Sequence, residues 1–390
     1  MAGRALRRVV RAWSDDNTQG FSRASETIPL NAIRPYVIDV GNNGELSSSG
    51  SYWTTEQDLT RLFADSIPSA AADWSKRRVL LYLHGGLNDE KAVVRRVVAF
   101  RDVFLANGIY PLHVMWESGI IESLSGMIRD LFTDVEERAG GVADWLKKLR
   151  DGLTEAKDRT LELTAAVPGT ALWREMKENA RLASQHPDKR GGMQLLARHA
   201  QAVVRRLGDA GKKRWELHVV GHSAGSIFAA YALPHLLALG VPLKSLQFMA
   251  PAITVALFKQ LLLPAIRSGR CPHPSLFVLD DLVERGDTVG PYGKSLLYLV
   301  SNAFEGQRDT PILGMQRSVE ADAELARFFE RSVGGLPSVV VAGTGGKPGN
   351  VSGSTTHVGF DNDPDTLNSI LRRVLGAEPQ RLFTARDLQS

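Results

Sequence analysis

The strongest chemical signal in the chain is the pentapeptide Gly-His-Ser-Ala-Gly from Gly221 to Gly225. It follows the apolar run 217–220 and precedes the apolar positions of a predicted helix, so Ser223 falls at a strand–turn–helix junction. The flanking glycines permit a sharp turn with the serine hydroxyl exposed at its apex. The helix N-terminus beside it favours a developing negative charge. This context predicts that Ser223 is a nucleophile; the alternative is a tight turn whose serine only caps the helix.

A second loop with adjacent glycines, Gly85 and Gly86, directly follows the apolar run 79–83. In acyl-transfer enzymes, a glycine-rich loop in this place presents backbone N–H groups to the oxyanion of a tetrahedral intermediate. The N–H of Ala224, the residue after the nucleophile, would supply another donor. We therefore expect Gly85, Gly86 and Ala224 to form an oxyanion hole. A plain Gly-Gly turn is the alternative.

A serine hydroxyl needs a general base, and the chain has nine histidines. His222 lies inside the elbow and should point away from Ser223. Seven others occupy predicted strands, helical or inserted segments, the glycine loop or a proline-flanked turn: His84, His113, His186, His199, His218, His235 and His273. His357 remains, on a glycine-containing loop between the last predicted strand (338–342) and the terminal helix. A base on that loop can reach the carboxyl ends of the strands, so His357 is the predicted base; the alternative is a solvated loop histidine.

The third member of a triad orients the imidazole and stabilises its charged form. The segment after the predicted strand 275–280 offers four acids: Asp280, Asp281, Glu284 and Asp287. We favour Asp287, because it lies past the strand and early in the connecting loop. Asp280, Asp281 and Glu284 remain open as alternatives, and each of the four would otherwise be an exposed charge or a helix cap.

The rest of the chain predicts the scaffold for these residues. Short β-rich runs are expected as strands at 36–40, 79–83, 110–116, 216–220, 245–249, 275–280 and 338–342, with 36–53 as a hairpin. Longer periodic patterns predict helices at 55–64, 89–106, 193–207 and 224–238, and a last helix that begins at Pro364 after the N-cap Asp363 and stops at Gly376. This alternation predicts an α/β fold with a mostly parallel sheet flanked by helices.

Residues 117–190 interrupt the alternation with a long helical pattern between two core strands. Candidate helices lie near 119–138, 142–165 and 170–185, punctuated by Gly140-Gly141 and Pro168-Gly169. We interpret the segment as a helical cap or lid insertion. Its apolar residues either pack on the core and on one another or, in part, line an acyl pocket beneath the lid.

Composition excludes several classes of protein. The chain has 390 residues, 47 Lys+Arg and 43 Asp+Glu, a formal net charge of +4 and a pI of about 9.1. Four arginines without a matching acid lie in residues 1–11, so residues 12–390 are neutral overall and carry no pervasive field for nucleic acid. The single cysteine, Cys271, fits a reducing compartment, and we expect the protein to be cytoplasmic. No metal or nucleotide motif predicts a cofactor.

Residues 1–20 form an N-terminal arm whose arginines repeat at helical spacing. Arg4, Arg7, Arg8 and Arg11 fall on one face of a helix, and Leu6, Val9, Val10 and Trp13 fall on another. The pattern is typical of a short basic amphipathic helix. Packing on its own domain or local disorder, peripheral membrane contact through residues 1–13, and an organellar presequence remain alternative interpretations.

Together, the glycine loop, the elbow and the histidine loop resemble the α/β-hydrolase superfamily, whose chain order of serine, acid and histidine is met by Ser223, Asp287 and His357. At the level of element order the resemblance covers most of residues 30–376. It implies an eight-stranded, mostly parallel sheet and hydrolysis through an acyl-enzyme. The chain departs from the longer His-Gly-Gly-Gly motif of one esterase and lipase group, which leaves open whether Gly85, Gly86 or Leu87 donates to the oxyanion.

The resemblance makes the expected function hydrolysis of carboxylic esters, with a small-molecule or lipid ester as substrate, no cofactor, no metal and no nucleic-acid partner. A thioesterase or amidase with the same triad, and a non-catalytic binding or membrane-recruited module, are the alternatives. The expected layout is an arm (1–20), a catalytic domain (21–376) that includes the 117–190 insertion, and a tail (377–390).

Overall fold

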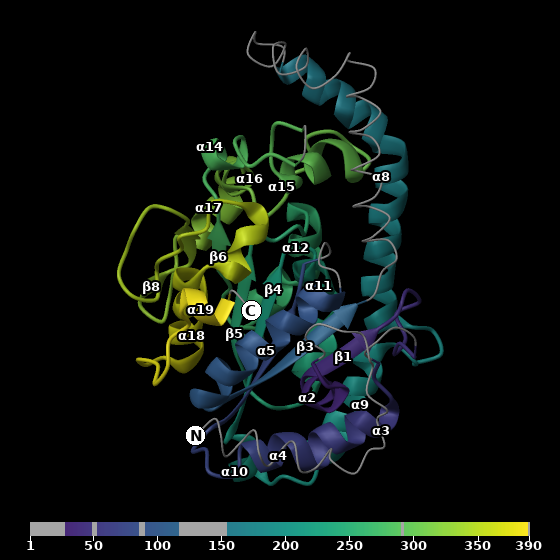
Figure 1. Ribbon diagram of the computed structural model, residues 1–390, viewed down its shortest axis with the longest axis vertical. Helices are drawn as coiled ribbons and strands as arrows, with labels where there is room; N and C mark the ends of the chain where they lie inside the picture. The colour runs from purple at the N-terminus through teal and green to yellow at the C-terminus, as the bar shows by residue number, and fades with distance from the viewer. Residues whose placement is uncertain (1–27, 49–52, 86–89, 117–153, 290–291, 389–390) are drawn as a thin grey trace.

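A seven-stranded sheet organises the computed structural model, which describes residues 28–48, 53–85, 90–116, 154–289 and 292–388 (Figure 1). The strand order is β1-β3-β2-β4-β5-β6-β9, and every neighbouring pair is parallel. Its strands are β1 (Val37–Val40), β2 (Arg77–Leu83), β3 (Ile109–Trp116), β4 (Trp215–His222), β5 (Leu243–Met249), β6 (Ser275–Val278) and β9 (Val339–Val341). The predicted α/β fold with a mostly parallel sheet is confirmed. The described residues hold seven of the eight strands that the resemblance implies.

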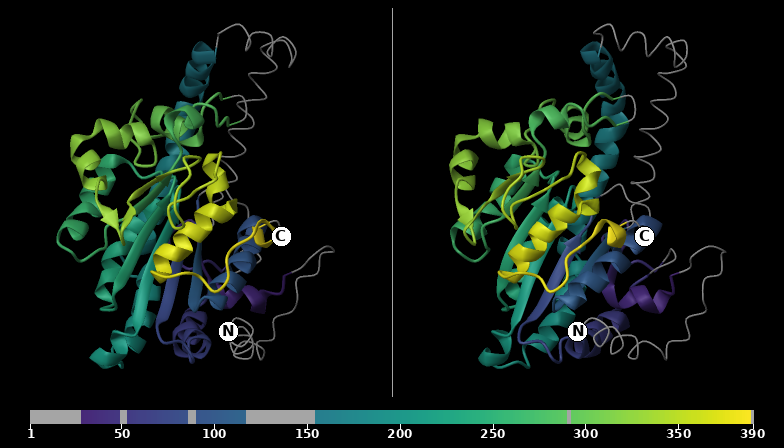
Figure 2. Two further views of the ribbon diagram at one scale, coloured as in Figure 1. Left: turned by 90° about the vertical axis from the view of Figure 1, so that its left-hand side faces the viewer. Right: turned by 60° about the vertical axis from the view of Figure 1, so that its left-hand side comes forward.

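Helices cover both faces of this sheet (Figure 2). α5 (Glu90–Ala106) connects β2 to β3, whereas α11 (Gly225–Ala238) connects β4 to β5 in the opposite direction along the sheet. Because such connections are right-handed, opposite directions place the two helices on opposite faces. With helices on both sides, strands become apolar along their whole length, and all eight residues of β3 are buried.

The α11 face carries a second layer of long helices. α8 (Thr154–Gln185) and α9 (Gly192–Val204) both lie between β3 and β4 in the chain, and both pack against α11 and against each other. α8 runs along one side of the molecule and projects beyond the end of the sheet (Figure 1). The carboxyl ends of the central strands therefore lie beside this helix.

α8 corrects one prediction. The sequence suggested separate helices at 142–165 and 170–185 divided by Pro168-Gly169, but α8 is continuous from Thr154 to Gln185. Pro168 is exposed, and the missing side chain of Gly169 makes room for the ring of Phe304, which a Cβ atom there would overlap. The glycine marks a close packing contact between helices rather than a helix end. The predicted helix 119–138 lies outside the described residues.

The predicted hairpin over 36–53 is found only next to its turn. After the turn, Leu46 forms an isolated antiparallel bridge with Val40, and the Ser47 N–H donates to the Asp39 carbonyl at 2.9 Å. The Asp39 N–H donates to Thr54 Oγ1 at 2.9 Å, so a threonine side chain takes the place of a second strand's carbonyl. Residues 49–52 lie outside the described residues.

Several short elements between β5 and α18 (Pro364–Leu375) had no sequence prediction. They are α12 (Val255–Leu261), α13 (Leu263–Arg267), α14 (Asp281–Glu284), α15 (Leu296–Leu299), the π-helix η3 (Val300–Phe304), α16 (Gln316–Ala321), α17 (Ala323–Phe329), the pair β7 (Ser332–Val333) and β8 (Leu336–Pro337), and the 3-10 helix η4 (His357–Asn362). A helix of one or two turns is too short to show a hydrophobic period. Among the helices described, none has the length and apolarity to cross a membrane.

Smaller elements complete the described chain: α2 (Leu30–Ile33), the 3-10 helix η1 (Arg34–Tyr36), α3 (Glu56–Arg61), the π-helix η2 (Leu62–Ser66), α4 (Ile67–Ala70), α10 (Asp209–Lys212) and α19 (Ala385–Leu388). The predicted helix 55–64 thus continues to Ala70. α18 begins and ends as expected: Asp363 accepts from the N–H of Thr366, and Gly376 ends the helix with a φ of 62°.

The segment after α18 folds back onto α5. Phe383 is buried at 2% exposure, and its ring lies 5.4 Å from Phe100 and 5.3 Å from Phe104. Asn368 of α18 bonds both backbone groups of Phe383, at 2.9 and 2.8 Å. This segment joins α18, the helix that follows the His357 loop, to α5.

We predict that Phe383→Ala lowers the free energy of unfolding by about 3–5 kcal/mol, because it leaves a cavity between two aromatic rings. Leu382→Ala, at the adjacent and 40% exposed position, should change it by no more than about 0.5 kcal/mol. Urea unfolding followed by circular dichroism measures both, and equal effects of the two substitutions would contradict the packing described for Phe383.

Candidate active site

Ser223 occupies a strained turn between β4 and α11. Its φ is +50°, in the left-handed region that costs a non-glycine residue about 1–3 kcal/mol unless its surroundings hold it there. The Ser223 N–H donates to the Met249 carbonyl at 2.9 Å, and its own carbonyl accepts from the Ala252 N–H at 3.0 Å. The segment after β5 therefore holds the serine backbone from both sides.

The two glycines of the elbow are required by close approach. A Cβ on Gly225 would overlap the carbonyl oxygen of Leu83, the last residue of β2. A Cβ on Gly221 would lie 3.1 Å from both the carbonyl of Gly225 and the ring of Phe248. The glycines therefore let α11 pack directly against the neighbouring strand, and the positive φ of the turn lies at Ser223 between them.

The structure brings Ser223 and His357 together. Ser223 Oγ lies 2.9 Å from Nε2 of His357, the first residue of η4, and both side chains are buried. Burial first, and then the electrostatic effect of His222, lower the pKa of His357 to about 3. The imidazole is therefore neutral at neutral pH, the state in which Nε2 can accept the serine proton.

Asp287 lies against His357 but on its main chain. Its Oδ2 accepts from the His357 backbone N–H at 2.6 Å. Nδ1 of the imidazole, the atom that a triad acid would engage, is buried and has no hydrogen-bond partner among the described residues. Burial raises the pKa of Asp287, against the lowering by the His357 N–H. The predicted acid is thus in contact with the predicted base, although not with its ring.

The other candidate acids are engaged elsewhere. Asp280 caps α14 by accepting from two backbone N–H groups at 2.8 and 2.9 Å. Asp281 accepts from the Tyr298 hydroxyl at 2.5 Å and from Arg285 at 2.8 Å. Glu284 is buried, and burial raises its pKa to about 8 despite the hydroxyl of Ser295 beside it. A carboxyl group that is protonated at neutral pH cannot stabilise an imidazolium.

Gly85 is the described residue of the predicted oxyanion loop. A Cβ on it would lie 3.1 Å from the Cβ of Ser223, so the loop passes directly over the serine side chain. His84 Nδ1 lies 2.6 Å from the Gly85 carbonyl and must carry the hydrogen, because a carbonyl only accepts. Gly86 and Leu87 lie outside the described residues.

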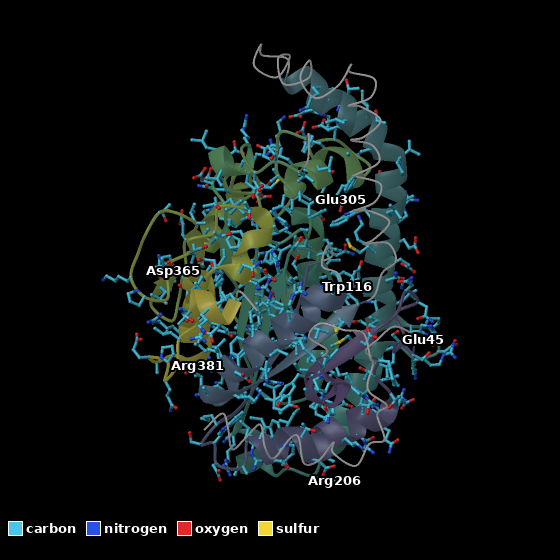
Figure 3. The ribbon with its side chains drawn as sticks, viewed as in Figure 1. Glu45, Trp116, Arg206, Glu305, Asp365 and Arg381 are labelled. Carbon is cyan, nitrogen blue, oxygen red and sulfur yellow. The ribbon has the colours of Figure 1, made fainter. Side chains whose placement is uncertain are left out.

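The backbone N–H of Ala224, the last predicted oxyanion donor, has no acceptor within the described part of the chain. It lies immediately before α11, where the helix N-terminus adds a positive potential. Trp116, at the end of β3, donates from Nε1 to the His84 carbonyl at 3.3 Å and so holds the facing loop (Figure 3). A donor beside the serine thus remains available to an oxyanion.

Sequence reasoning missed the roles of two buried residues beside the pair. His222 Nε2 lies 3.0 Å from the His357 carbonyl, so this histidine turns toward the histidine loop. Asp361 lies 3.6 Å from Nδ1 of His222 and is also buried. The only sequence signal was position: His222 precedes the serine, and Asp361 follows His357 by one helical turn.

A cavity of about 330 Å³ opens beside the elbow, between α8, α11 and α12. Its lining combines apolar with charged or polar side chains: Arg174, Lys177, Glu178, Ile227, Tyr231, Thr254, Ala256, Leu257, Gln260 and Glu305. Ile227 belongs to the first turn of α11, which places this cavity next to the nucleophile's own helix. Glu305 ties its wall to α8, accepting from Trp173 at 2.5 Å and Lys177 at 2.6 Å (Figure 3).

The described residues hold no group of three or more His, Cys, Asp or Glu side chains arranged to bind a metal ion. Comparison with known proteins found no matching family model, no matching curated protein and no matching solved structure.

We predict that Asp287→Asn lowers kcat for a p-nitrophenyl ester by about 10²–10⁴-fold, because the imidazolium loses its neighbouring anion. Glu284→Gln, which replaces a neutral acid by a neutral amide of the same size, should keep kcat within about threefold. Steady-state rates at pH 7.5, with thermal unfolding as a check on folding, decide between the two acids. A larger loss in the glutamine variant would move the role to Glu284.

Proposed function

We propose that this protein is a serine hydrolase of the α/β-hydrolase type that cleaves carboxylic esters through an acyl-enzyme. One observation carries the proposal: Ser223, held at a φ of +50° at the end of a central strand, lies 2.9 Å from the neutral Nε2 of His357. Backbone strain in a buried serine next to an imidazole is costly for a merely structural turn. The same contact argues against the alternative of a non-catalytic binding module.

In the proposed reaction, Ser223 Oγ attacks the ester carbonyl while His357 Nε2 takes its proton. The Ala224 N–H, with the Gly85–Gly86 loop, stabilises the oxyanion. His357 then gives the proton to the leaving alcohol, which leaves an acyl group on Ser223. Water, deprotonated by His357, attacks the acyl-enzyme, releases the carboxylic acid and restores the serine. Asp287 supports the imidazolium in both steps.

The cavity beside α11 supports an ester with an apolar part. Ile227 of α11 and Ala256 and Leu257 of α12 supply the apolar part of its lining, and α8 supplies charged groups. Such a cavity suits an aliphatic chain that ends near a polar rim. Thioesters and amides can react through the same steps, so we include them in the substrate panel below.

We predict that a fluorophosphonate probe labels the full-length protein. Ser223→Ala should abolish the labelling and lower the rate of ester hydrolysis by at least about 10⁴-fold. Ser226→Ala is the matched control: the Ser226 hydroxyl donates to the Ser223 carbonyl and accepts from the Ile253 N–H, with no histidine beside it among the described residues, so this variant should still be labelled at Ser223. Intact-mass spectrometry reads the adduct. Labelling that survives in the Ser223→Ala variant would assign the nucleophile elsewhere.

We also predict that Ala256→Trp selectively slows hydrolysis of long acyl or alkyl esters. Ala256 is exposed at the cavity wall, so the indole fills the cavity without disturbing the core. We expect kcat/KM to fall about tenfold or more for an eight-carbon ester and by less than about threefold for acetate esters. Ala323→Trp on α17, outside the cavity lining, is the control. An equal loss across ester, thioester and amide chain lengths would exclude this cavity as the substrate's site.

A further inference from the structure

We propose that His222 is a positioning residue that fixes the main chain of His357 and is itself held by Asp361. The inference rests on the proposed function, because it concerns the pairing of Ser223 with its base. It assigns a task to the residue between Gly221 and the nucleophile, and to an acid that lies outside the Ser223–His357–Asp287 set.

The first observation is that two adjacent residues, His222 and Ser223, both contact His357. Ser223 contacts the imidazole of His357 at 2.9 Å, and His222, one residue earlier, contacts the His357 carbonyl at 3.0 Å. The elbow therefore holds both the ring and the main chain of the base. A shift of the histidine loop relative to β4 would therefore disturb both contacts.

The second observation is the direction of the His222 bond. A carbonyl oxygen only accepts, so Nε2 of His222 must carry a hydrogen. On the other side of the ring, Nδ1 faces Asp361 Oδ2 at 3.6 Å. Both side chains are almost fully buried, at 3% and 2% exposure, so little water screens their attraction. This separation is longer than a hydrogen bond, so Asp361 limits the position of the His222 ring by close buried contact.

The third observation is that Asp361 is held as an anion. It accepts from the Tyr82 hydroxyl at 3.1 Å and pairs with Arg96 at 3.3 Å. Burial alone would raise the pKa of Asp361, but Arg96 and then His222 bring it down to about 2. The acid is therefore charged at every pH at which the protein would work, and Arg96 anchors it to α5.

Other polar groups surround the His222–Asp361 contact. Tyr82 of β2, His84 of the loop that follows and Arg96 of α5 act on Asp361, and the ring of His113 in β3 lies 5.2 Å from that of Tyr82. Asp287 accepts from the His357 N–H at 2.6 Å. The two peptide groups that flank the α-carbon of His357 are thus held by different elements.

The test compares two replacements of His222. His222→Gln keeps an N–H donor that can reach the carbonyl, whereas His222→Leu keeps the bulk and loses the donor. We expect His222→Leu to lower kcat and the rate of fluorophosphonate labelling about tenfold to a hundredfold with little change in KM, because the base is no longer held. His222→Gln should recover most of this loss. His218→Gln, on the same strand but bonded to Ser245, should match the wild type.

Two further readouts separate positioning from general damage. His222 lowers the pKa of His357, so both His222 variants should move the acid limb of kcat/KM toward higher pH. Asp361→Asn should slow labelling as His222→Leu does, and the double variant should be no slower than His222→Leu alone.

The outcomes are distinct. Wild-type protein that takes no label would refute the proposed function. Wild-type labelling together with a His222→Leu variant of equal rate and unmoved acid limb would refute the positioning role alone. Should His222→Leu fail to fold, His222→Ala takes its place as the variant without a donor, and additive losses from His222→Ala and Asp361→Asn would overturn the coupling.

Discussion

The contact between Gly225 and the carbonyl of Leu83 is the constraint on which the candidate site depends. It brings the first turn of α11 against the end of β2 with no side chain between them. The chain must then leave β4 and enter α11 within two residues, which forces Ser223 to a φ of +50°. The strain is balanced by bonds to Met249 and Ala252, so the nucleophile's place is set by three neighbouring strands.

His357 is also held by several contacts, which come from the C-terminal part of the chain. The loop that carries His357 leads into α18, where Asp363 accepts from the N–H of both Gly353 and Thr366. Arg373 of the same helix donates to the carbonyls of Gly349 and Pro337, at 2.8 Å each, although no carboxylate neutralises it among the described residues. The loop is therefore tied to a helix whose apolar side lies in the core. A serine and a histidine that are 134 residues apart meet at 2.9 Å because each is fixed independently to the sheet.

The sequence predicted the parts of this arrangement that leave a local signature. Strands buried on both faces, glycines at close contacts and the caps of α18 each have a physical requirement that one residue type meets, and the fold class followed from them. Tertiary choices left no such trace. Gly169 has the residue type of a helix break but makes room for Phe304, the Thr54 hydroxyl accepts the Asp39 N–H of β1, and the short helices after β5 are set by packing. Ser223, His357 and Asp287 could be named from their places after strands, but whether Asp287 contacts the ring or the main chain, and that His222 turns to His357, depend on side-chain directions.

Three acids near His357 differ in their surroundings, and their pKa values shift differently as a result. Arg96 and the Tyr82 hydroxyl lower the pKa of Asp361, so this acid stays charged, whereas burial raises the pKa of Glu284 to about 8 and also raises the pKa of Asp287, against the His357 N–H. Groups of one chemistry whose pKa values are driven apart can perform different steps at a single pH. The permanent anion is suited to hold geometry, since its charge does not change during a reaction. The half-buried Asp287 is suited to stabilise the imidazolium of His357, which forms only during the reaction. Attraction to that cation would offset the cost of desolvating the Asp287 carboxylate.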